Sequence, residues 1–213
     1  MLTVHHLGLS QSERIVWLCE ELELPYHLQI YQRDPRTRLA PAEYKALHPM
    51  QLSPVIQDGE VLLAESGAII EYLLARYGDG RLQVPVDAPN FPDYLFWFHF
   101  ANGTFLPSVS TQMLGLAGAD GKVSPFVAVY QARTERAFAL LEQQLGKTDY
   151  LAGAEFTAAD IINVFGLSTL RAFTRRSLDG LPAIGAYLAR IGQRPAYRRA
   201  MEKGDPGLTP MLA

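Results

Sequence analysis

The pattern of the chain changes near residue 80, and this change limits the fold more than any other feature. Up to Tyr77, segments typical of strands and helices follow one another as strand, helix, strand, helix, strand, strand, helix. After residue 92 the apolar residues recur only at helical spacing. We therefore expect an α/β domain at residues 1–79, a Gly- and Pro-rich linker at 80–91 and an all-helical domain at 92–213.

The hairpin is the best-defined of the expected elements. Asp58-Gly59 lies between two short apolar runs, 55–57 and 61–63, and this pair favours a two-residue turn between antiparallel strands. The other elements expected in the first domain are strands at 2–7 and 28–31 and helices after Ser12, at Pro41 and from Ile69 to Gly78. Helices are expected in the second domain at 93–114, 124–145, 157–170, 182–192 and after Pro195, with a loop at 115–121.

The composition excludes several classes of function. The chain has 213 residues, of which 48% are hydrophobic, so enough apolar side chains are present to form cores. A net charge of −3 gives no broad positive field for nucleic acid or an anionic membrane. No apolar run approaches the roughly 20 residues that span a bilayer, and the first residues lack the blocks of a secretory signal. These features predict a cytoplasmic protein whose partner is a small molecule or another protein.

The single cysteine, Cys19, excludes an internal disulfide, a Cys-x-x-Cys redox pair and a cysteine-rich metal site. Thiol chemistry in this protein would therefore need a thiol from a substrate. His5 and His6 are neighbours on the first expected strand, so their side chains face opposite sides of the sheet. They are poorly placed to bind one metal ion, and we interpret both as structural and expect no metal site.

Two interpretations fit Ser10-Gln-Ser-Glu13 at the start of the first helix. The segment has the form of a capping box, in which a serine and a glutamate satisfy the first backbone N–H groups of a helix. Alternatively, a hydroxyl beside those N–H groups can hold an anion such as a thiolate. The local sequence favours the capping role, because serine is common at helix caps.

Two further serines precede regular elements. Ser53-Pro54 comes before the hairpin, and its peptide bond can be trans or cis. If it is cis, the backbone of Ser53 could pair with an extended peptide-like ligand. Glu65-Ser66 lies where the hairpin ends, and in isolation it is best interpreted as a helix cap. The alternative is that Ser66 binds a carboxylate while Glu65 pairs with an ammonium group.

The second domain offers structural features. Thr157-Ala-Ala-Asp160 predicts a capping box at the start of a helix. An aromatic cluster covers more than one helix face, which predicts core packing and one wall of an apolar pocket. Its members are Tyr94, Phe96, Trp97, Phe98, Phe100 and Phe105.

Taken together and in this order, the segments resemble the cytosolic glutathione transferases over essentially the whole chain. Gly8 to Arg14 resembles the serine-containing loop of the serine-type, theta-like members, His48 to Val55 the segment that leads to the family's cis-proline, and Ala64 to Ile70 its Glu-Ser glutathione signature. Phe156 to Ile161 resembles a capping box of the family, and Gln193 to Tyr197 its C-terminal region. The likeness is greatest to the yeast-related bacterial and fungal branch.

This resemblance implies a thioredoxin-like N-terminal domain, an all-α C-terminal domain and a transferase that conjugates glutathione to a small apolar electrophile, as in detoxification. Ser10 would stabilise the thiolate of glutathione, which acts as cosubstrate, Ser53 would pair with its cysteinyl backbone, and Glu65 with Ser66 would bind its γ-glutamyl end. The implied glutathione-binding residues are Gln51, Leu52, Ser53, Pro54, Glu65 and Ser66. The resemblance also implies a cytoplasmic homodimer.

The chain departs from the family at Gln51-Leu52, where members often have glycine followed by lysine or arginine. Leu52 would leave the glycyl carboxylate of glutathione without a cationic partner, unless His48 or Gln51 takes that role. This departure keeps open a binding or regulatory protein with weak or no catalysis. A glutathione-dependent peroxidase or dehalogenase would use the same thiolate, and the sequence does not distinguish these activities. It also leaves open the electrophile and whether Ser10 or Ser12 contacts the thiol.

Overall fold

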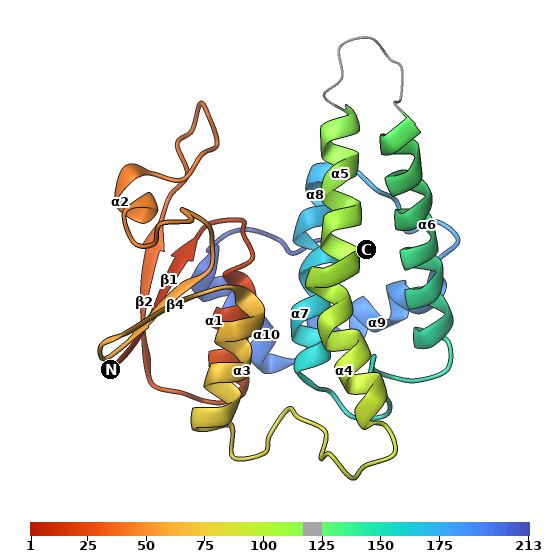
Figure 1. Cartoon of the computed structure of the whole chain (residues 1–213), viewed down its shortest axis with the longest axis horizontal. Coiled ribbons are helices and arrows are strands. Elements are labelled where there is room, and N and C mark those ends of the chain that lie inside the picture. Colours follow the sequence, from red (N-terminus) through yellow and green to blue (C-terminus); the bar gives the residue numbers. More distant parts are fainter. Residues whose placement is uncertain (117–124) are drawn as a thin grey trace. The chain divides into compact units, whose positions relative to one another are not determined.

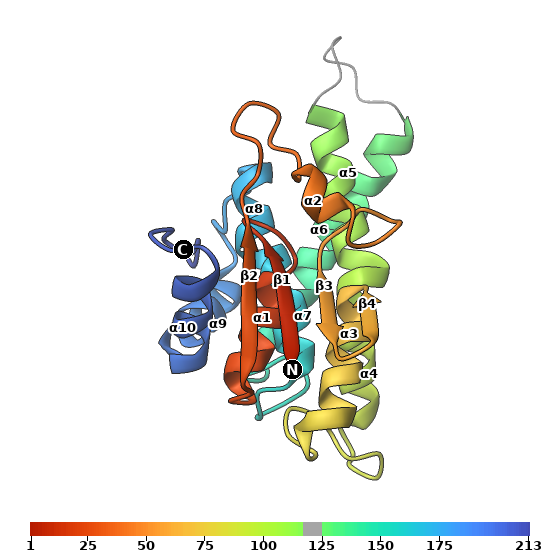
Figure 2. The ribbon, with the colours of Figure 1, turned by 90° about the vertical axis from the view of Figure 1, so that its left-hand side faces the viewer.

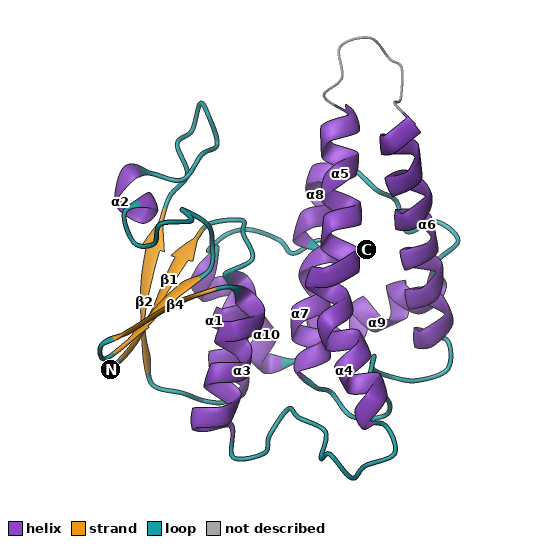
Figure 3. Ribbon diagram, viewed as in Figure 1, coloured by secondary structure: helices purple, strands orange, loops and turns teal. Residues whose placement is uncertain are grey.

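The computed structural model describes residues 1–116 and 125–213 of the chain. These residues form two compact units, Met1–Gln83 with Gly192–Pro210 and Val84–Ile191 with Met211–Ala213. The strands lie in the first unit, whereas the described part of the second is built on helices (Figure 3). The expected loop at 115–121 falls largely outside the described residues. Among the described helices, none has both the length and the apolar content needed to cross a bilayer.

The first unit contains one four-stranded sheet in the order β2 (Tyr26–Tyr31), β1 (Leu2–Leu7), β3 (Val55–Asp58), β4 (Val61–Ala64). Strands β1 and β2 are parallel, and β3 runs antiparallel to both β1 and β4 (Figure 2). The helices are α1 (Glu13–Glu21), α2 (Ala42–Lys45) and α3 (Ser66–Leu73), and a π-helical turn extends α3 to Gly78. This is the predicted thioredoxin-like arrangement.

Successive side chains of β1 face opposite sides of the sheet and therefore lie in two different environments. Leu7 lies on one face, in a cluster with Val55 and with Tyr44 of α2. His6 lies on the other face, where it contacts Ser12 in the segment that leads into α1. The alternation follows from the period of two in a strand and fixes which histidine approaches α1.

The hairpin differs from the prediction by one position. Asp58 is still paired with Val61, so the two-residue turn is Gly59-Glu60 and not Asp58-Gly59. Gly59 has a φ of 61°, which a glycine adopts without steric cost. The carboxylate of Asp58 accepts hydrogen bonds from the hydroxyls of Tyr72 and Tyr77, which holds Asp58 in the ladder.

The last helix, α10 (Pro195–Gly204), packs on α1 within the first unit, although its position in the chain assigned it to the helical domain. The rings of Trp17 and Tyr197 meet edge to face with centroids 4.9 Å apart, and both are buried. Arg194 Nε donates to Glu21 Oε1 at 2.7 Å. Figure 1 shows α10 beside α1 in this unit. Continuity in sequence could not reveal this packing, because the contacts join residues about 180 positions apart.

The second unit consists of α4 (Phe91–Phe100), α5 (Leu106–Leu116), α6 (Pro125–Leu145), α7 (Ala158–Leu167), α8 (Thr169–Thr174) and α9 (Pro182–Gln193). A π-helical turn, Ala101–Phe105, joins α4 to α5, so these elements together form the helix expected at 93–114. The helix expected at 157–170 is divided at Ser168, whose φ of −118° and ψ of −94° are not helical. The helical periodicity predicted these elements but not their interruptions.

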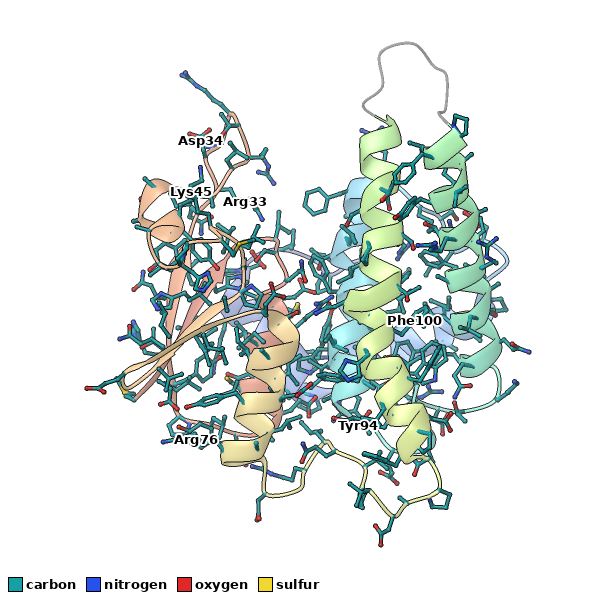
Figure 4. The ribbon with its side chains drawn as sticks, in the orientation of Figure 1. Arg33, Asp34, Lys45, Arg76, Tyr94 and Phe100 are labelled. Atoms are coloured by element: carbon teal, nitrogen blue, oxygen red, sulfur yellow. The ribbon has the colours of Figure 1, made fainter. Side chains whose placement is uncertain are left out.

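The capping box at Thr157 is confirmed. Thr157 Oγ1 accepts from Ala159 N at 3.3 Å, and Asp160 Oδ2 accepts from Thr157 N at 2.9 Å. Most of the aromatic cluster forms part of the core, including Tyr94 and Phe100, which Figure 4 labels on α4. Phe96 differs, because half of its surface is exposed.

Candidate functional site

A pocket of about 150 Å³ lies in the first unit, where the start of α1, the segment before β3 and the junction of β4 with α3 meet. It is lined by Gln11, His48, Met50, Leu52, Ser53, Pro54, Ala64, Glu65 and Ser66. The structure thus brings together five of the predicted binding residues, which come from two separate segments. The predicted residues Ser10 and Gln51 are not among the lining residues.

Two segments of the pocket wall have unusual backbone geometry. The Ser53–Pro54 bond is cis, as the resemblance implies. Gln51 and Glu65 have φ angles of 56° and 71°, a region that costs a residue with a side chain about 1–2 kcal/mol. Glu65 occupies the cap position of α3, but its side chain makes no capping hydrogen bond. The predicted cap position at Glu65-Ser66 is therefore confirmed, without a capping hydrogen bond from the side chain of Glu65, and backbone strain of this kind is typical of ligand-binding segments.

Arg14 lies directly behind two residues of the pocket wall. Its Nη1 donates to Ser66 Oγ and to Gln11 Oε1, both at 3.0 Å, and its side chain is buried. Burial lowers the pKa of the Arg14 guanidinium to about 9, against an opposing effect of Glu13, so the group stays cationic at neutral pH. A positive charge behind Ser66 favours a carboxylate in front of it. The local sequence around Arg14 does not reveal this contact, because it joins residues 52 positions apart.

The hydroxyl of Ser10 is linked to the pocket through Ser53. Ser10 Oγ donates to Leu7 O at 2.6 Å and lies 2.9 Å from Ser12 Oγ and 2.8 Å from Ser53 Oγ. The helix begins after Ser12, whose side chain makes no capping hydrogen bond, but Ser10 Oγ accepts from Ser12 N at 3.3 Å, as a serine of a capping box does. Ser10 Oγ is thus held by one carbonyl, two hydroxyls and one backbone N–H.

The other groups considered from the sequence lie outside the pocket. Cys19 is buried in α1, and burial raises the pKa of its thiol, so it is a poor nucleophile. His5 Nδ1 lies 3.0 Å from Tyr31 Oη, whereas His6 Nδ1 lies 2.9 Å from Ser12 Oγ on the opposite face of the sheet. In the described part of the chain, no three His, Cys, Asp or Glu side chains are grouped to hold a metal ion.

The lining of the pocket carries little positive charge. Leu52 lies on the wall with 55% of its surface exposed. Of the lining residues, all of which the structure describes, only His48 can carry a positive charge. A carboxylate near Leu52 would therefore have to rely on His48, Gln51 or water for a partner.

Comparison with known proteins identifies two domain families in the chain. Residues 10–76 match the family model of the glutathione S-transferase N-terminal domain, and residues 110–195 match that of the C-terminal domain. Glutathione S-transferase 3 of Schizosaccharomyces pombe is 32% identical over 95% of this chain and 88% of its own length. Glutathione S-transferase 1 of Saccharomyces cerevisiae is 28% identical over 95% of each chain. The crystal structure of a glutathione S-transferase from Actinobacillus pleuropneumoniae has a TM-score of 0.86 and 35% identity, and covers 98% of this chain and 94% of its own.

These likenesses extend over almost the whole of both this chain and its relatives. They confirm the predicted fold, a thioredoxin-like domain with an all-α domain, and the predicted enzyme activity, the transfer of glutathione. The chain belongs to the glutathione S-transferase family.

Proposed function

We propose that the pocket in the first unit binds glutathione and that the protein is a serine-type transferase of the theta-like branch. The observation that carries this proposal is the convergence of Ser53, Glu65 and Ser66 on one pocket, with the buried Arg14 behind it. A tripeptide with two carboxylates and one ammonium group needs both signs of charge and backbone donors. Glu65 offers a negative charge on the wall, Arg14 a positive charge behind Ser66, and the start of α3 backbone donors.

The γ-glutamyl end of glutathione binds at the start of α3. Its carboxylate lies at Ser66, where the helix N-terminus and Arg14 both favour an anion. Glu65 pairs with its ammonium group. The cysteinyl backbone pairs with Ser53 beside Pro54, and the glycyl end lies toward Gln51 and Leu52.

The hydroxyl of Ser10 stabilises the thiolate of bound glutathione. A free thiol has a pKa of about 8.5, so only a few per cent is ionised at neutral pH. A hydrogen bond to a charged group contributes about 1.5–3 kcal/mol, which lowers the thiol pKa by about one to two units. Ser10 is favoured over Ser12 for this role because Ser10 contacts Ser53 at the pocket, whereas Ser12 is completely buried.

The activated thiolate attacks a small apolar electrophile. We place this reaction in the cytoplasm, where thiols are kept reduced, and in a homodimer of the kind found in the family. A peroxidase or dehalogenase reaction would use the same thiolate. The exposed Leu52 favours one other candidate, a binding or regulatory protein that holds glutathione weakly.

Calorimetric titration of glutathione at neutral pH tests the site. We expect the wild-type protein to bind at micromolar to low millimolar concentration. Ser66→Ala should weaken binding about tenfold, since it removes a hydrogen bond to a charged group. The matched control is Ser177→Ala on an exposed loop of the second unit, which should leave the affinity unchanged.

Leu52→Lys distinguishes the two candidate functions. If the protein is a transferase, the wild type should bind glutathione measurably, and the added cation should strengthen that binding. If the wild-type protein does not bind glutathione and Leu52→Lys restores binding, the chain is a transferase fold that has lost its cosubstrate. Absence of binding in both proteins would rule out this pocket as the glutathione site.

A further inference from the structure

A chain of hydrogen bonds runs from the pocket to the C-terminal end of α10. Ser53 Oγ lies 2.8 Å from Ser10 Oγ, and Ser10 Oγ lies 2.9 Å from Ser12 Oγ. Ser12 Oγ lies 2.9 Å from His6 Nδ1, and His6 Nε2 lies 3.3 Å from Asp205 Oδ2. All five residues belong to the first unit. Ser53 lines the pocket, and the imidazole of His6 is completely buried.

Close contacts fix the position of Asp205 at the far end of this hydrogen-bonded chain. Asp205 follows α10 directly, and a Cβ atom on Gly204 would lie 3.2 Å from His6 Nε2, so the glycine lets the end of the helix reach the imidazole. Asp205 Oδ1 also accepts from Leu9 N at 3.1 Å. Leu9 has a φ of 53°, an unfavourable conformation that this contact helps to maintain in the loop before Ser10.

Asp205, the acceptor at the far end, determines which atom is the donor in each of these hydrogen bonds. A carboxylate only accepts hydrogen bonds, so neutral His6 carries its proton on Nε2 and donates it to Asp205. Nδ1 is then an acceptor, and Ser12 must donate to it. The proton between Ser10 and Ser12 therefore comes from Ser10, which shares it with Leu7 O, and the proton between Ser53 and Ser10 comes from Ser53. Each donor thus points from the pocket toward His6.

This arrangement contains a serine, a histidine and an aspartate, but it does not form a nucleophilic triad. Ser12 has no exposed surface and lies behind Ser10, so no substrate can reach its oxygen. His6 and Asp205 can act on a bound substrate only through Ser12 and Ser10. They are positioning residues, and the group that they affect is at the pocket end of the chain.

We propose that this hydrogen-bonded chain takes up the proton of bound glutathione and stores it on His6. The proposal rests on glutathione binding in the pocket. The S–H bond breaks and its proton passes to Ser10 Oγ, while Ser10 gives its own proton to Ser12 and Ser12 gives its proton to His6 Nδ1. A neutral thiol and a neutral imidazole become a thiolate and an imidazolium, and no serine is left ionised.

The same transfer reverses the hydrogen bonds between Ser10 and Ser12 and between Ser12 and His6, while His6 still donates to Asp205. His6 then donates to Ser12 and Ser12 to Ser10, so the hydroxyl of Ser10 points outward and donates to the thiolate. The carboxylate of Asp205 stabilises the imidazolium. A further charged group at this end is Arg33 in the loop after β2, which Figure 4 labels. Its guanidinium donates to Gly8 O at 2.8 Å and interacts electrostatically with Asp205.

Nitrogen NMR of histidine-labelled wild-type protein tests the proposal without a substitution in the chain. The protonation of His6 is followed at neutral pH before and after saturation with glutathione or S-methylglutathione, which has no thiol proton. The protein has five histidines, so the His6 signals are assigned by comparison with variants of the other four. We expect glutathione to convert His6 to the imidazolium and S-methylglutathione to leave it neutral. Binding of glutathione without this conversion would overturn the relay alone, and absence of binding would overturn the proposed function as well.

Two variants test the effect on the thiol. In Asp205→Asn, one carboxylate oxygen is replaced by an amide NH₂, which is a donor. If the remaining oxygen still accepts from Leu9 N, the NH₂ group faces His6 Nε2 and makes that nitrogen an acceptor. The imidazole then carries its proton on Nδ1, which cannot accept a proton from Ser12. In His6→Asn, the carboxamide can bond to Ser12 but does not take up a proton. In both variants we expect the pKa of the bound thiol, measured by thiolate absorbance, to rise by about one unit and kcat to fall about tenfold at neutral pH.

The affinity for glutathione should change less than threefold in these variants, because the chain acts on the thiol and not on the peptide backbone. Arg194→Gln is the matched control, since it removes a contact between α10 and α1 but no residue of the hydrogen-bonded chain from Ser53 to Asp205. It should leave the thiol pKa unchanged. Unchanged thiol pKa values in both Asp205→Asn and His6→Asn would overturn the proposal, and so would an equal rise in Arg194→Gln.

Discussion

Three oxygen atoms surround Ser10 Oγ: Leu7 O at 2.6 Å, Ser53 Oγ at 2.8 Å and Ser12 Oγ at 2.9 Å. We predict that Ser10→Ala raises the pKa of bound glutathione by about one to two units and lowers turnover at neutral pH about ten- to a hundredfold. The measurement is the pH dependence of kcat with a standard electrophile. Ser53→Ala, which keeps the backbone of Ser53, is the comparison and should cost less. An unchanged rate in Ser10→Ala would move the role to Ser12 or to backbone donors.

Cys19 is a second residue whose chemistry is fixed by its surroundings. Burial raises the pKa of its thiol, and Glu20 adds to the shift, so the thiolate is scarcely populated in the folded protein. We predict that a thiol reagent modifies Cys19 at least a hundredfold more slowly in native than in unfolded protein. Cys19→Ala should keep full transferase activity. Rapid modification that abolishes activity would instead indicate a cysteine-type mechanism.

The residues of the site differ in how well the sequence could predict them. Ser53, Glu65 and Ser66 lie in short motifs next to regular elements, and the structure brings them to one pocket. Arg14 and Asp205 act through contacts that span 52 and 199 positions, and no local pattern records such contacts. The role of Ser10 as a cap was predicted from a pattern that fits many helices; its hydroxyl accepts from Ser12 N, but its other partners, Leu7 O and the hydroxyls of Ser12 and Ser53, were not predicted.

At the level of elements, periodicity predicted where strands and helices lie because burial of one face imposes a repeat of 2 or 3.6 residues. It did not predict the division between α7 and α8 at Ser168, because the apolar repeat continues through the break. It also could not assign α10 to a unit, since the apolar face of a helix does not specify its partner. The packing of Trp17 on Tyr197 decides that question.

The start of α7 gives a prediction on stability and pH. Asp160 is completely buried and accepts from Leu151 N, Thr157 N, Thr157 Oγ1 and Tyr187 Oη. Burial outweighs these hydrogen bonds and raises the pKa of Asp160 from 3.8 to about 6. Between these values the folded state binds more protons than the unfolded state, so this contribution to stability is present at low pH and is lost as pH rises through 6. The loss between pH 4 and 7 is about 2 kcal/mol.

Urea unfolding of wild-type protein and Asp160→Asn measures this contribution. We expect the wild-type free energy of unfolding, relative to that of Asp160→Asn, to decrease by about 2 kcal/mol from pH 4 to pH 7. Thr157→Val is the matched control, because it removes the capping hydroxyl and keeps the carboxylate. It should cost about 1 kcal/mol without removing the decrease with pH. A relative free energy that rises with pH would show that the hydrogen bonds dominate and that the pKa of Asp160 is lowered.

At the level of the whole molecule, the chain passes between the two units three times, after Gln83, Ile191 and Pro210. The last three residues return to the second unit, where Arg171 Nη2 donates to Ala213 O at 2.7 Å. The first unit is therefore not a continuous stretch of sequence, and a chain cut in the linker would lack α10 and Asp205. The proposed relay thus makes the chemistry of the N-terminal serines depend on a segment near the other end of the chain.

Exposed apolar side chains on β4 give a prediction on assembly. β4 is one of the two edge strands of the sheet, and Val61 and Leu62 on it are 40% and 46% exposed. An open edge with apolar side chains is unfavourable in water unless another surface covers it. We expect light scattering at micromolar concentration to give twice the chain mass of 23.7 kDa. Leu62→Glu should shift the protein toward monomer, because a carboxylate would be buried without a partner.

The control for this variant is Val86→Glu, at a linker residue that is 80% exposed. It adds the same charge and should leave the dimer intact. The far-ultraviolet circular dichroism of Leu62→Glu should match the wild type, so that loss of the dimer is distinguished from unfolding. A wild-type mass of one chain would contradict the homodimer. A dimeric Leu62→Glu would instead remove β4 from the interface and leave the exposed Phe96 of α4 as the next residue to substitute.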